Sequence, residues 1–329
     1  MPESKTLGPD MSCRDTPRNS VNALRPASIL ISARTSLALL IPLFVALVLL
    51  HRIACAQAPI PLPGTRIDVD VLGNVFVLDA RAGTLTLYDR GMQIVTQTGG
   101  PGWENGRFDD PAGLWARNGL DVFVADFGNH RVQRFDRNLA FISSLSTRDS
   151  QNPRERFGYP ADVALSRLGE LFICDTENAR IVKVSAQNNV ELSFGDFGAG
   201  RGRLSHPIQV EIGPGETIVV LDTPRVVLFD SFGNFVSTFP EPFLSAPSCL
   251  FADQETVALV DSNRVLCFDK SFRPVESFDV RDILGFSPAH VFSLVIAGGR
   301  WYLLTEAGLS VFNDPRDSSG LLDKEKKTH

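Results

Sequence analysis

The chain has 329 residues, of which 43% are hydrophobic, and a formal net charge of −6. This is enough material for one large domain or two ordinary ones. Residues 1–58 carry six basic and three acidic side chains, which leaves 26 basic and 35 acidic side chains and a net charge of −9 for the rest. An acidic body argues against a nucleic-acid binder, which needs lysine and arginine to displace counterions from phosphates.

The first predicted element is an apolar run of 15 residues without charge, 36–50, which follows four arginines. A membrane span needs about 20 apolar residues. An export signal needs a basic start, an apolar stretch of about 7–15 residues and a small-x-small cleavage site, and Ala54-Cys55-Ala56 and Ala56-Gln57-Ala58 both fit that site. We predict that 1–58 is a basic lead with a cleaved signal peptide or, alternatively, an uncleaved membrane anchor through 36–50. In both cases the body is exported, to the periplasm or the extracellular space.

After the signal, one pattern recurs six times at spacings of 39–49 residues. Each copy is an apolar run, a polar turn and a second apolar run, which is typical of a β-hairpin. Periods of this length indicate solenoids, propellers or arrays. The copies span 75–89, 122–136, 171–185, 218–230, 257–269 and 301–313.

A further short run precedes each hairpin, and it opens with proline in copies two to six. Proline suits the first residue of a strand, where no ladder donor is needed. Another run follows the hairpin in several copies. Four short strands per unit and six units predict an all-β, six-bladed β-propeller over 59–315, with a polar, disordered tail at 316–329.

The sixth copy has no fourth run after Phe312, because the residues from Arg316 onward are mostly polar and charged. A missing outer strand would leave an open sheet edge. The spare segment 59–64 contains three prolines, which only an edge position tolerates. We therefore predict that it pairs with 309–312 and closes the ring.

On these residues the chain resembles the NHL-repeat family. Copy two, 108–136, has Pro-x-Gly-Leu, an apolar strand that ends in Asp126, and a turn with Asn129-x-Arg131-Val. Copy three matches well, and the resemblance extends over about 64–315. It implies a six-bladed propeller but says little about activity, because one fold hosts many functions.

An aspartate closes the first strand of the hairpin in five copies, and an arginine opens the second in four. Because a single active site does not need four copies, we interpret the Asp–Arg pairs as structural, worth about 0.2–1 kcal/mol each when partly exposed. The pairs are Asp126–Arg131, Asp175–Arg180, Asp222–Arg225 and Asp261–Arg264.

The six innermost strands differ from one another at two positions that are expected to face the axis. The first position aligns Arg66, Gly113, Asp162, Gln209, Cys249 and His290, and the second aligns Asp68, Trp115, Ala164, Glu211, Phe251 and Phe292. Intervening residues are uniformly aliphatic, as core positions should be. The candidate ligand-binding residues are therefore Arg66, Asp68, Asp162, Gln209, Glu211 and His290. The alternative is that these residues satisfy one another or trapped water.

Two enzyme classes share this architecture. Six-bladed lactonases hold an axial calcium ion, which takes six to eight oxygen ligands, and Asp68, Asp162, Gln209 and Glu211 form a thin set for it. Peptide-amidating lyases use histidine-bound zinc, and the body has only His130, His206, His290 and His329. Cys174, Cys249 and Cys267 lie in apolar runs, have no Cys-x-x-Cys spacing, and are expected to be buried free thiols.

The function predicted from these patterns is a non-catalytic, exported binding or scaffold protein, monomeric and without a cofactor. Its ligand is expected to be a protein, peptide or glycan and no nucleic acid, held on the disc face that carries the linkers 100–110, 147–159 and 196–206. The alternative is a calcium-dependent hydrolase of the lactonase type, with Asp68, Asp162 and Glu211 at its axial site.

Overall fold

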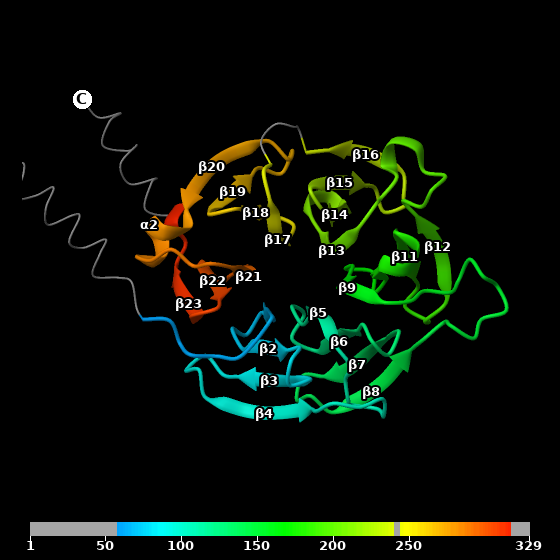
Figure 1. Ribbon diagram of the computed structural model, residues 1–329, viewed down its shortest axis with the longest axis horizontal. Helices are drawn as coiled ribbons and strands as arrows, with labels where there is room; N and C mark the ends of the chain where they lie inside the picture. Colours follow the sequence, from blue (N-terminus) through cyan, green and yellow to red (C-terminus); the bar gives the residue numbers. More distant parts are fainter. Residues whose placement is uncertain (1–57, 240–243, 317–329) are drawn as a thin grey trace, which may run out of the picture. The chain divides into compact units, whose positions relative to one another are not determined.

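The computed structural model describes residues 58–239 and 244–316. These residues form six antiparallel sheets, which follow one another in chain order around a central axis (Figure 1). We call the sheets blades one to six. Five blades have four strands and the sixth has three, which confirms the predicted six-bladed β-propeller.

Within each blade the strands are hydrogen-bonded in chain order from the axis outward. Blade one contains β1 (Arg66–Val69), β2 (Val75–Asp79), β3 (Thr84–Tyr88) and β4 (Ile94–Gly99). Blade two contains β5 (Pro111–Trp115), β6 (Asp121–Asp126), β7 (Arg131–Asp136) and β8 (Phe141–Leu145). Blade three contains β9 (Pro160–Leu165), β10 (Leu171–Asp175), β11 (Arg180–Val184) and β12 (Val190–Phe194).

The second half of the chain repeats this plan with shorter hairpins. Blade four contains β13 (Pro207–Ile212), β14 (Ile218–Asp222), β15 (Arg225–Phe229) and β16 (Phe235–Thr238). Blade five contains β17 (Pro247–Ala252), β18 (Val257–Asp261), β19 (Arg264–Phe268) and β20 (Pro274–Asp279). Blade six contains β21 (Val291–Ala297), β22 (Arg300–Thr305) and β23 (Gly308–Asn313), preceded by the short helix α2 (Val280–Leu284).

The second strand of each blade is apolar on both faces, apart from its end residues, because a neighbouring blade covers each face. Every residue of β10, β14 and β18 is buried. Outer strands alternate between exposed and half-buried residues, as β8 and β20 do. The core therefore lies between the blades. Phenylalanine rings join blades three and four, where the ring centroids of Phe194 and Phe229 are 4.9 Å apart.

The up-and-down order of the strands gives the ring two distinct faces. The linker face carries the linkers between blades and the turns between second and third strands. The loop-tip face carries the turns between first and second strands and between third and fourth strands. Innermost strands run from the linker face to the loop-tip face, because each follows a linker.

The segment before β1 closes the ring, as predicted. Ile60 forms an antiparallel bridge with Leu309 of β23. The Ile60 N–H donates to the Leu309 carbonyl at 2.8 Å, and the Leu309 N–H donates to the Ile60 carbonyl at 2.9 Å. The first described segment thus covers the free edge of blade six and joins it to blade one.

Gly308 makes this closure possible, and we expect Gly308→Ala to destabilise the fold by about 1–3 kcal/mol. Its φ is +119°, and a Cβ there would lie 2.2 Å from the Ile60 carbonyl oxygen. Gly298 also has a positive φ, +57°, but a Cβ on it would meet nothing within 4 Å. Urea unfolding of both alanine variants separates backbone strain from the clash. Equal losses would contradict a specific role for the close approach.

Several predictions fall outside the described residues. These concern the apolar run 36–50, the cleavage sites and most of the tail 316–329. Among residues 58–239 and 244–316, no helix is long and apolar enough to cross a membrane. Cys174, Cys249 and Cys267 are buried free thiols, as predicted.

Candidate functional site

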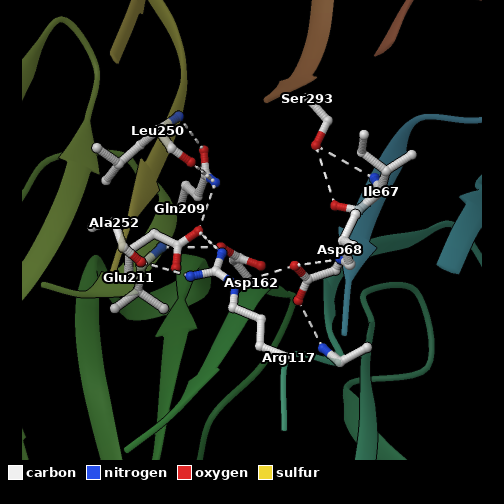
Figure 2. Close-up of polar contacts among 12 residues, drawn as sticks. Ile67, Asp68, Arg117, Asp162, Gln209, Glu211, Leu250, Ala252 and Ser293 are labelled. Atoms are coloured by element: carbon white, nitrogen blue, oxygen red, sulfur yellow. Dashed lines mark hydrogen bonds and ion pairs between the residues drawn. The ribbon is translucent and has the colours of Figure 1, made fainter. Parts of the chain in front are cut away.

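Two side chains of the first axial position, those of Asp162 and Gln209, link an innermost strand to the next one around the ring (Figure 2). The Val210 N–H donates to Asp162 Oδ2 at 3.0 Å. Gln209 makes a two-way contact with Leu250, accepting from its N–H at 2.8 Å and donating to its carbonyl at 2.5 Å. These side chains occupy backbone groups that would otherwise be unpaired at the edge of each blade.

In blades one, two and six the contacts between neighbouring innermost strands are of other kinds. Arg66 donates to the Phe292 carbonyl of blade six at 2.8 Å and to the Ala112 carbonyl of blade two at 3.2 Å. Gly113 gives blade three room, since a Cβ there would lie 2.5 Å from the Cα of Asp162. The alternative in which the axial polar residues satisfy protein groups therefore describes Arg66, Asp162 and Gln209.

His290 does not belong to this set, and its predicted register is wrong. Val291 opens the strand in blade six and pairs with Thr305, whereas Pro207 pairs with Asp222 in blade four. Ser293 thus occupies the first axial position, with its hydroxyl 3.4 Å from the N and O of Ile67. Val295 occupies the second position in place of Phe292.

The displacement of His290 has a physical cause in the hairpin of blade six. Thr305 replaces the aspartate, and the next residue, Glu306, accepts the backbone N–H groups of Ala289 and His290. In blade four, Asp222 accepts the N–H groups of Ser205 and His206 in the same way. His290 is therefore exposed at the entry to β21 and corresponds to His206.

Arg117, which the sequence patterns did not single out, lies at the centre of the site. It follows β5 and reaches across the axis between Asp68 and Glu211 (Figure 2). Its Nε lies 3.1 Å from Asp68 Oδ1, and its NH2 group lies 2.7 Å from Glu211 Oε1. NH1 donates to the Ala252 carbonyl at 2.6 Å, and the guanidinium stacks on the Phe251 ring at 4.7 Å.

Extending the alignment of the innermost strands by two residues would have identified this arginine. The residues two places beyond the second axial position are Asp70, Arg117, Ser166, Gly213, Asp253 and Ala297. Arg117 is the single basic side chain among them. Its contacts join blade two to blades one, four and five at the loop-tip end of the axis.

Burial dominates the ionisation of the axial carboxyl groups. It raises the pKa of Glu211 to about 8, against the opposing attraction of Arg117. It also raises the pKa of Asp162 to about 7, opposed by Arg66 and by backbone N–H donors. Burial disfavours the charge of Arg117 as well, but Glu211 and Asp68 outweigh it and raise the pKa of Arg117.

We expect Asp162 to make the protein less stable as the pH rises from about 4 to 7. The folded state keeps its proton up to a pKa of about 7, whereas the ordinary value is 3.8. At this group the unfolded state binds fewer protons than the folded state. The free energy of unfolding therefore falls by at most about 1.4 kcal/mol per pH unit because of this group. Asp162→Asn is expected to flatten the urea-unfolding free energy between pH 5 and pH 7, leaving the slope that Glu211 contributes.

Asp269→Asn is the control for this pH profile. Hydrogen bonds from the backbone of Arg273 and from its neighbours lower the pKa of Asp269. Asp269 therefore makes the protein more stable as the pH rises, and this effect lies at more acidic pH than that of Asp162. An Asp162→Asn variant whose pH profile matches that of the native protein would refute a neutral, buried Asp162.

The hairpin aspartates and arginines form the four predicted pairs. The nitrogen–oxygen distances are 2.7 Å for Asp126–Arg131, 2.8 Å for both Asp175–Arg180 and Asp222–Arg225, and 3.6 Å for Asp261–Arg264. All four carboxylates are buried, unlike the partly exposed pairs that the sequence suggested. Each also accepts backbone N–H groups from the linker before its blade, such as Asp109 N–H at 2.8 Å on Asp126.

A family model described as NHL repeat matches residues 108–135 and 157–184. These ranges contain the innermost strand and hairpin of blades two and three, and the same strand order recurs in the other described blades. The chain is an NHL-repeat six-bladed β-propeller. Blades two and three carry the clearest copies of the repeat.

Curated relatives match part of this NHL propeller. It is 31% identical over 140 residues to protein brain tumor of Drosophila melanogaster, a match that covers 41% of this chain and 13% of that protein. It is 31% identical over 111 residues to a probable peptidyl-alpha-hydroxyglycine alpha-amidating lyase, pgal-1, of Caenorhabditis elegans, covering 32% of this chain and 30% of that one. The matches thus span less than a third of either relative.

Solved structures share the fold of the NHL propeller at low sequence identity. A streptogramin B lyase superposes with a TM-score of 0.54 at 12% identity, covering 74% of this chain and 77% of the lyase. The hydrazine synthase of Kuenenia stuttgartiensis superposes with a TM-score of 0.52 at 14% identity, covering 78% and 97%. These similarities establish the fold alone.

The axial groups of the NHL propeller do not fit a calcium ion. Calcium needs six to eight oxygen ligands, but Asp68 accepts from the Ala116 N–H at 2.7 Å and pairs with Arg117. A guanidinium therefore already occupies the space between Asp68 and Glu211. In the described part of the chain, no group of three or more His, Cys, Asp or Glu side chains could hold a metal ion.

The described histidines lie outside the innermost strands. His130 is in the hairpin turn of blade two, and His206 and His290 directly precede the innermost strands of blades four and six.

Proposed function

We propose that the protein is a non-catalytic binding propeller and that it recognises a protein or peptide on its linker face. Three linkers on this face carry exposed aromatic side chains. Trp103 is 76% exposed, Phe197 is 80% exposed and Tyr159 is 39% exposed. Large apolar residues left in contact with water on one face of a ring are typical of an interaction surface.

Arginines stand beside these aromatic rings. The guanidinium of Arg203 lies 4.4 Å from the centre of the Phe197 ring. That of Arg148 lies 5.9 Å from the Tyr159 ring, which also contacts the rings of His130 at 4.1 Å and Phe127 at 5.1 Å. Tryptophan, tyrosine and arginine contribute most of the binding energy in protein interfaces, so this combination favours a protein ligand. It is the observation on which the proposal rests.

The axial residues support a non-catalytic function by a separate argument. An acid, base or nucleophile must have a free face toward its substrate. Asp68 and Glu211 instead bind Arg117, and Gln209 binds the backbone of Leu250. The axis of this propeller is held together by the side chains that an enzyme of this shape would use on its substrate.

Peptide-display and glycan arrays probed with the labelled full chain test the proposal. We expect peptide ligands whose binding weakens at least tenfold in Phe197→Ala, as for a residue central to an interface. Val236→Ala, an exposed apolar residue on an outer strand, is the matched control and should bind as the native protein does. Ligands that bind Phe197→Ala normally would place recognition elsewhere.

Calcium provides the discriminating experiment for the hydrolase alternative. Since Arg117 occupies the axial site, we expect no rise in the unfolding temperature when calcium is added. A rise that disappears in Asp162→Ala would instead support a calcium-dependent hydrolase.

We also propose that the body is exported, on the basis of the basic lead and the apolar run 36–50. N-terminal sequencing of the mature protein tests this proposal. A start at Gln57 or Pro59 indicates a cleaved signal, and an intact Met1 indicates an anchor or no export.

A further inference from the structure

The loop-tip face carries a set of exposed aliphatic side chains on three consecutive blades. They stand in the turns between the first and second strands, where short polar residues are the rule. Their exposed fractions are 75% for Val71, 50% for Leu72, 64% for Leu120 and 77% for Leu168. We call these four residues the loop-tip patch.

The turns of the patch in blades one and two are in direct contact. The Val71 N–H donates to the Arg117 carbonyl at 3.2 Å, which joins the turns of blades one and two. A Cβ on Gly119 would lie 3.2 Å from Val71 Cγ2. Leu168 stands in the corresponding turn of the next blade around the ring.

Each of these blades also places an exposed arginine on the same face. Arg90 and Arg137 lie in the turns between third and fourth strands of blades one and two, and Arg167 precedes Leu168. The Arg90 Nε donates to the Leu72 carbonyl, so this arginine lies directly beside the patch. In residues 58–239 and 244–316, none of the three forms an ion pair.

The acidic residues of these turns are bound by backbone amides. Asp70 accepts the N–H groups of Leu72 and Asn74. Asp89 and Asp136 accept two N–H groups each within their own turns. The backbone thus holds these three carboxylates, whereas Glu170 in the turn of blade three pairs with Lys183 at 2.7 Å.

The turns between first and second strands differ on the other half of the same face. The corresponding turns of blades four to six are 213–217, 253–256 and 298–299. They contain Glu216, Asp253 and Glu255 and, among the described residues, no exposed large hydrophobic side chain. The aliphatic tips are thus confined to the first turns of blades one to three, whereas the turns between third and fourth strands of blades four and five expose Phe232, which is 76% exposed, and the cations Lys270 and Arg273.

We propose that the loop-tip face of blades one to three docks on an anionic lipid bilayer. Aliphatic side chains enter the boundary between headgroups and acyl chains, and arginines lie at the level of the lipid phosphates. Charge complementarity selects this occupant, because cationic side chains close to a bilayer are attracted to anionic lipids. A polar protein surface would not complement four exposed aliphatic side chains that share a face with three arginines.

The direction of the chain at its first described residues points the same way. Ile60 runs antiparallel to β23, and β23 runs from the linker face toward the loop-tip face. Ala58 and Pro59 therefore precede Ile60 on the side of the loop-tip face.

This inference is independent of the linker-face ligand and assigns the two faces different partners. A propeller docked in this way presents Trp103, Tyr159 and Phe197 away from the bilayer, because they lie on the opposite face. Failure of one proposal leaves the other standing.

A polarity-sensitive dye on single cysteines tests the docking in the full chain. Cys13 and Cys55 are replaced by serine, and the three remaining cysteines are buried. Dye is placed by Leu120→Cys or Leu168→Cys, with Glu255→Cys as the control on the acidic half of the same face and Phe197→Cys as the control on the linker face. The proteins are mixed with vesicles of phosphatidylcholine with or without phosphatidylserine.

We expect dye emission at Leu120→Cys and Leu168→Cys to rise and move to shorter wavelength only with phosphatidylserine. Both control positions should stay as in water. Glutamine at each of Arg90, Arg137 and Arg167 should lower the docked-to-free ratio by about fivefold per arginine.

Unchanged emission at the tips on vesicles that carry the protein would overturn the proposal. So would a blue shift that depends on protein concentration without vesicles, since it would show that a second copy covers the patch. An equal response at Glu255→Cys would show non-specific adsorption and overturn it as well.

Discussion

Replacing Arg117 with methionine is expected to lower the free energy of unfolding by about 3–5 kcal/mol. Asp68 and Glu211 would lose their shared cation in a site where Asp68 is fully buried and only 7% of the Glu211 side chain is exposed. The hydrogen bond to the Ala252 carbonyl would also be lost, and with it the link to blade five. Urea unfolding at pH 8, where Glu211 is partly ionised, measures the effect.

Two further variants show whether charge at the axis is the cause. Arg134→Met removes an ion pair of equal length, 2.7 Å to Asp121, whose arginine is 43% exposed, and should cost less than about 1 kcal/mol. Adding Asp68→Leu and Glu211→Leu to Arg117→Met removes the unpaired charges and should recover most of the loss. A triple variant no more stable than Arg117→Met would mean that the arginine acts through its backbone contact instead.

The strand order within each blade could be predicted from the sequence because each hairpin repeats the same pattern of apolar runs around a polar turn. The second strands are apolar on both faces apart from their end residues, and the proline that opens an innermost strand pairs with the hairpin aspartate in blades two to five, as Pro111 does with Asp126. Ring closure by Ile60 followed from counting the strands of the sixth copy. These features depend on residues close in sequence and on strand number.

The axial site could be predicted only in part because it depends on contacts between blades. Asp68 and Glu211 face the axis as aligned, but the arginine that joins them comes from a turn, where the strand alignment stopped. His290 was misplaced because Pro288 does not open β21: Val291, three residues later, pairs with Thr305. Alignment on proline could not detect this shift, since Pro288 remains in the sequence.

The role of the axis is therefore different from the one its charges suggest. A ring of six blades needs links between innermost strands whose edges face one another across a narrow space. Asp162, Gln209 and Ser293 make these links by binding backbone groups of the next blade. Gly113 makes no such link, and its lack of a side chain instead lets blade three approach closely.

Replacing a hairpin arginine is expected to lower the stability of the protein, and the size of the loss should differ between blades. Arg180→Ala is expected to cost about 3 kcal/mol because it leaves Asp175 buried without its cation. The guanidinium lies 2.8 Å from Asp175 and also donates to the Arg156 carbonyl at 2.6 Å, which ties the linker before blade three to the hairpin. Urea unfolding measures the loss, and limited proteolysis should cut the linker 146–159 faster.

Arg264→Ala is the matched control, because Arg264 occupies the same turn position in blade five. Its side chain is 50% exposed and its nearest nitrogen lies 3.6 Å from Asp261, so its removal should cost less than about 1 kcal/mol. The buried carboxylate there is bound through Oδ1 by the N–H groups of Ser245 and Ala246, and these bonds persist in the variant. If both alanine variants lose the same stability, the arginines serve the hairpin turn alone and the linker contact of Arg180 contributes nothing.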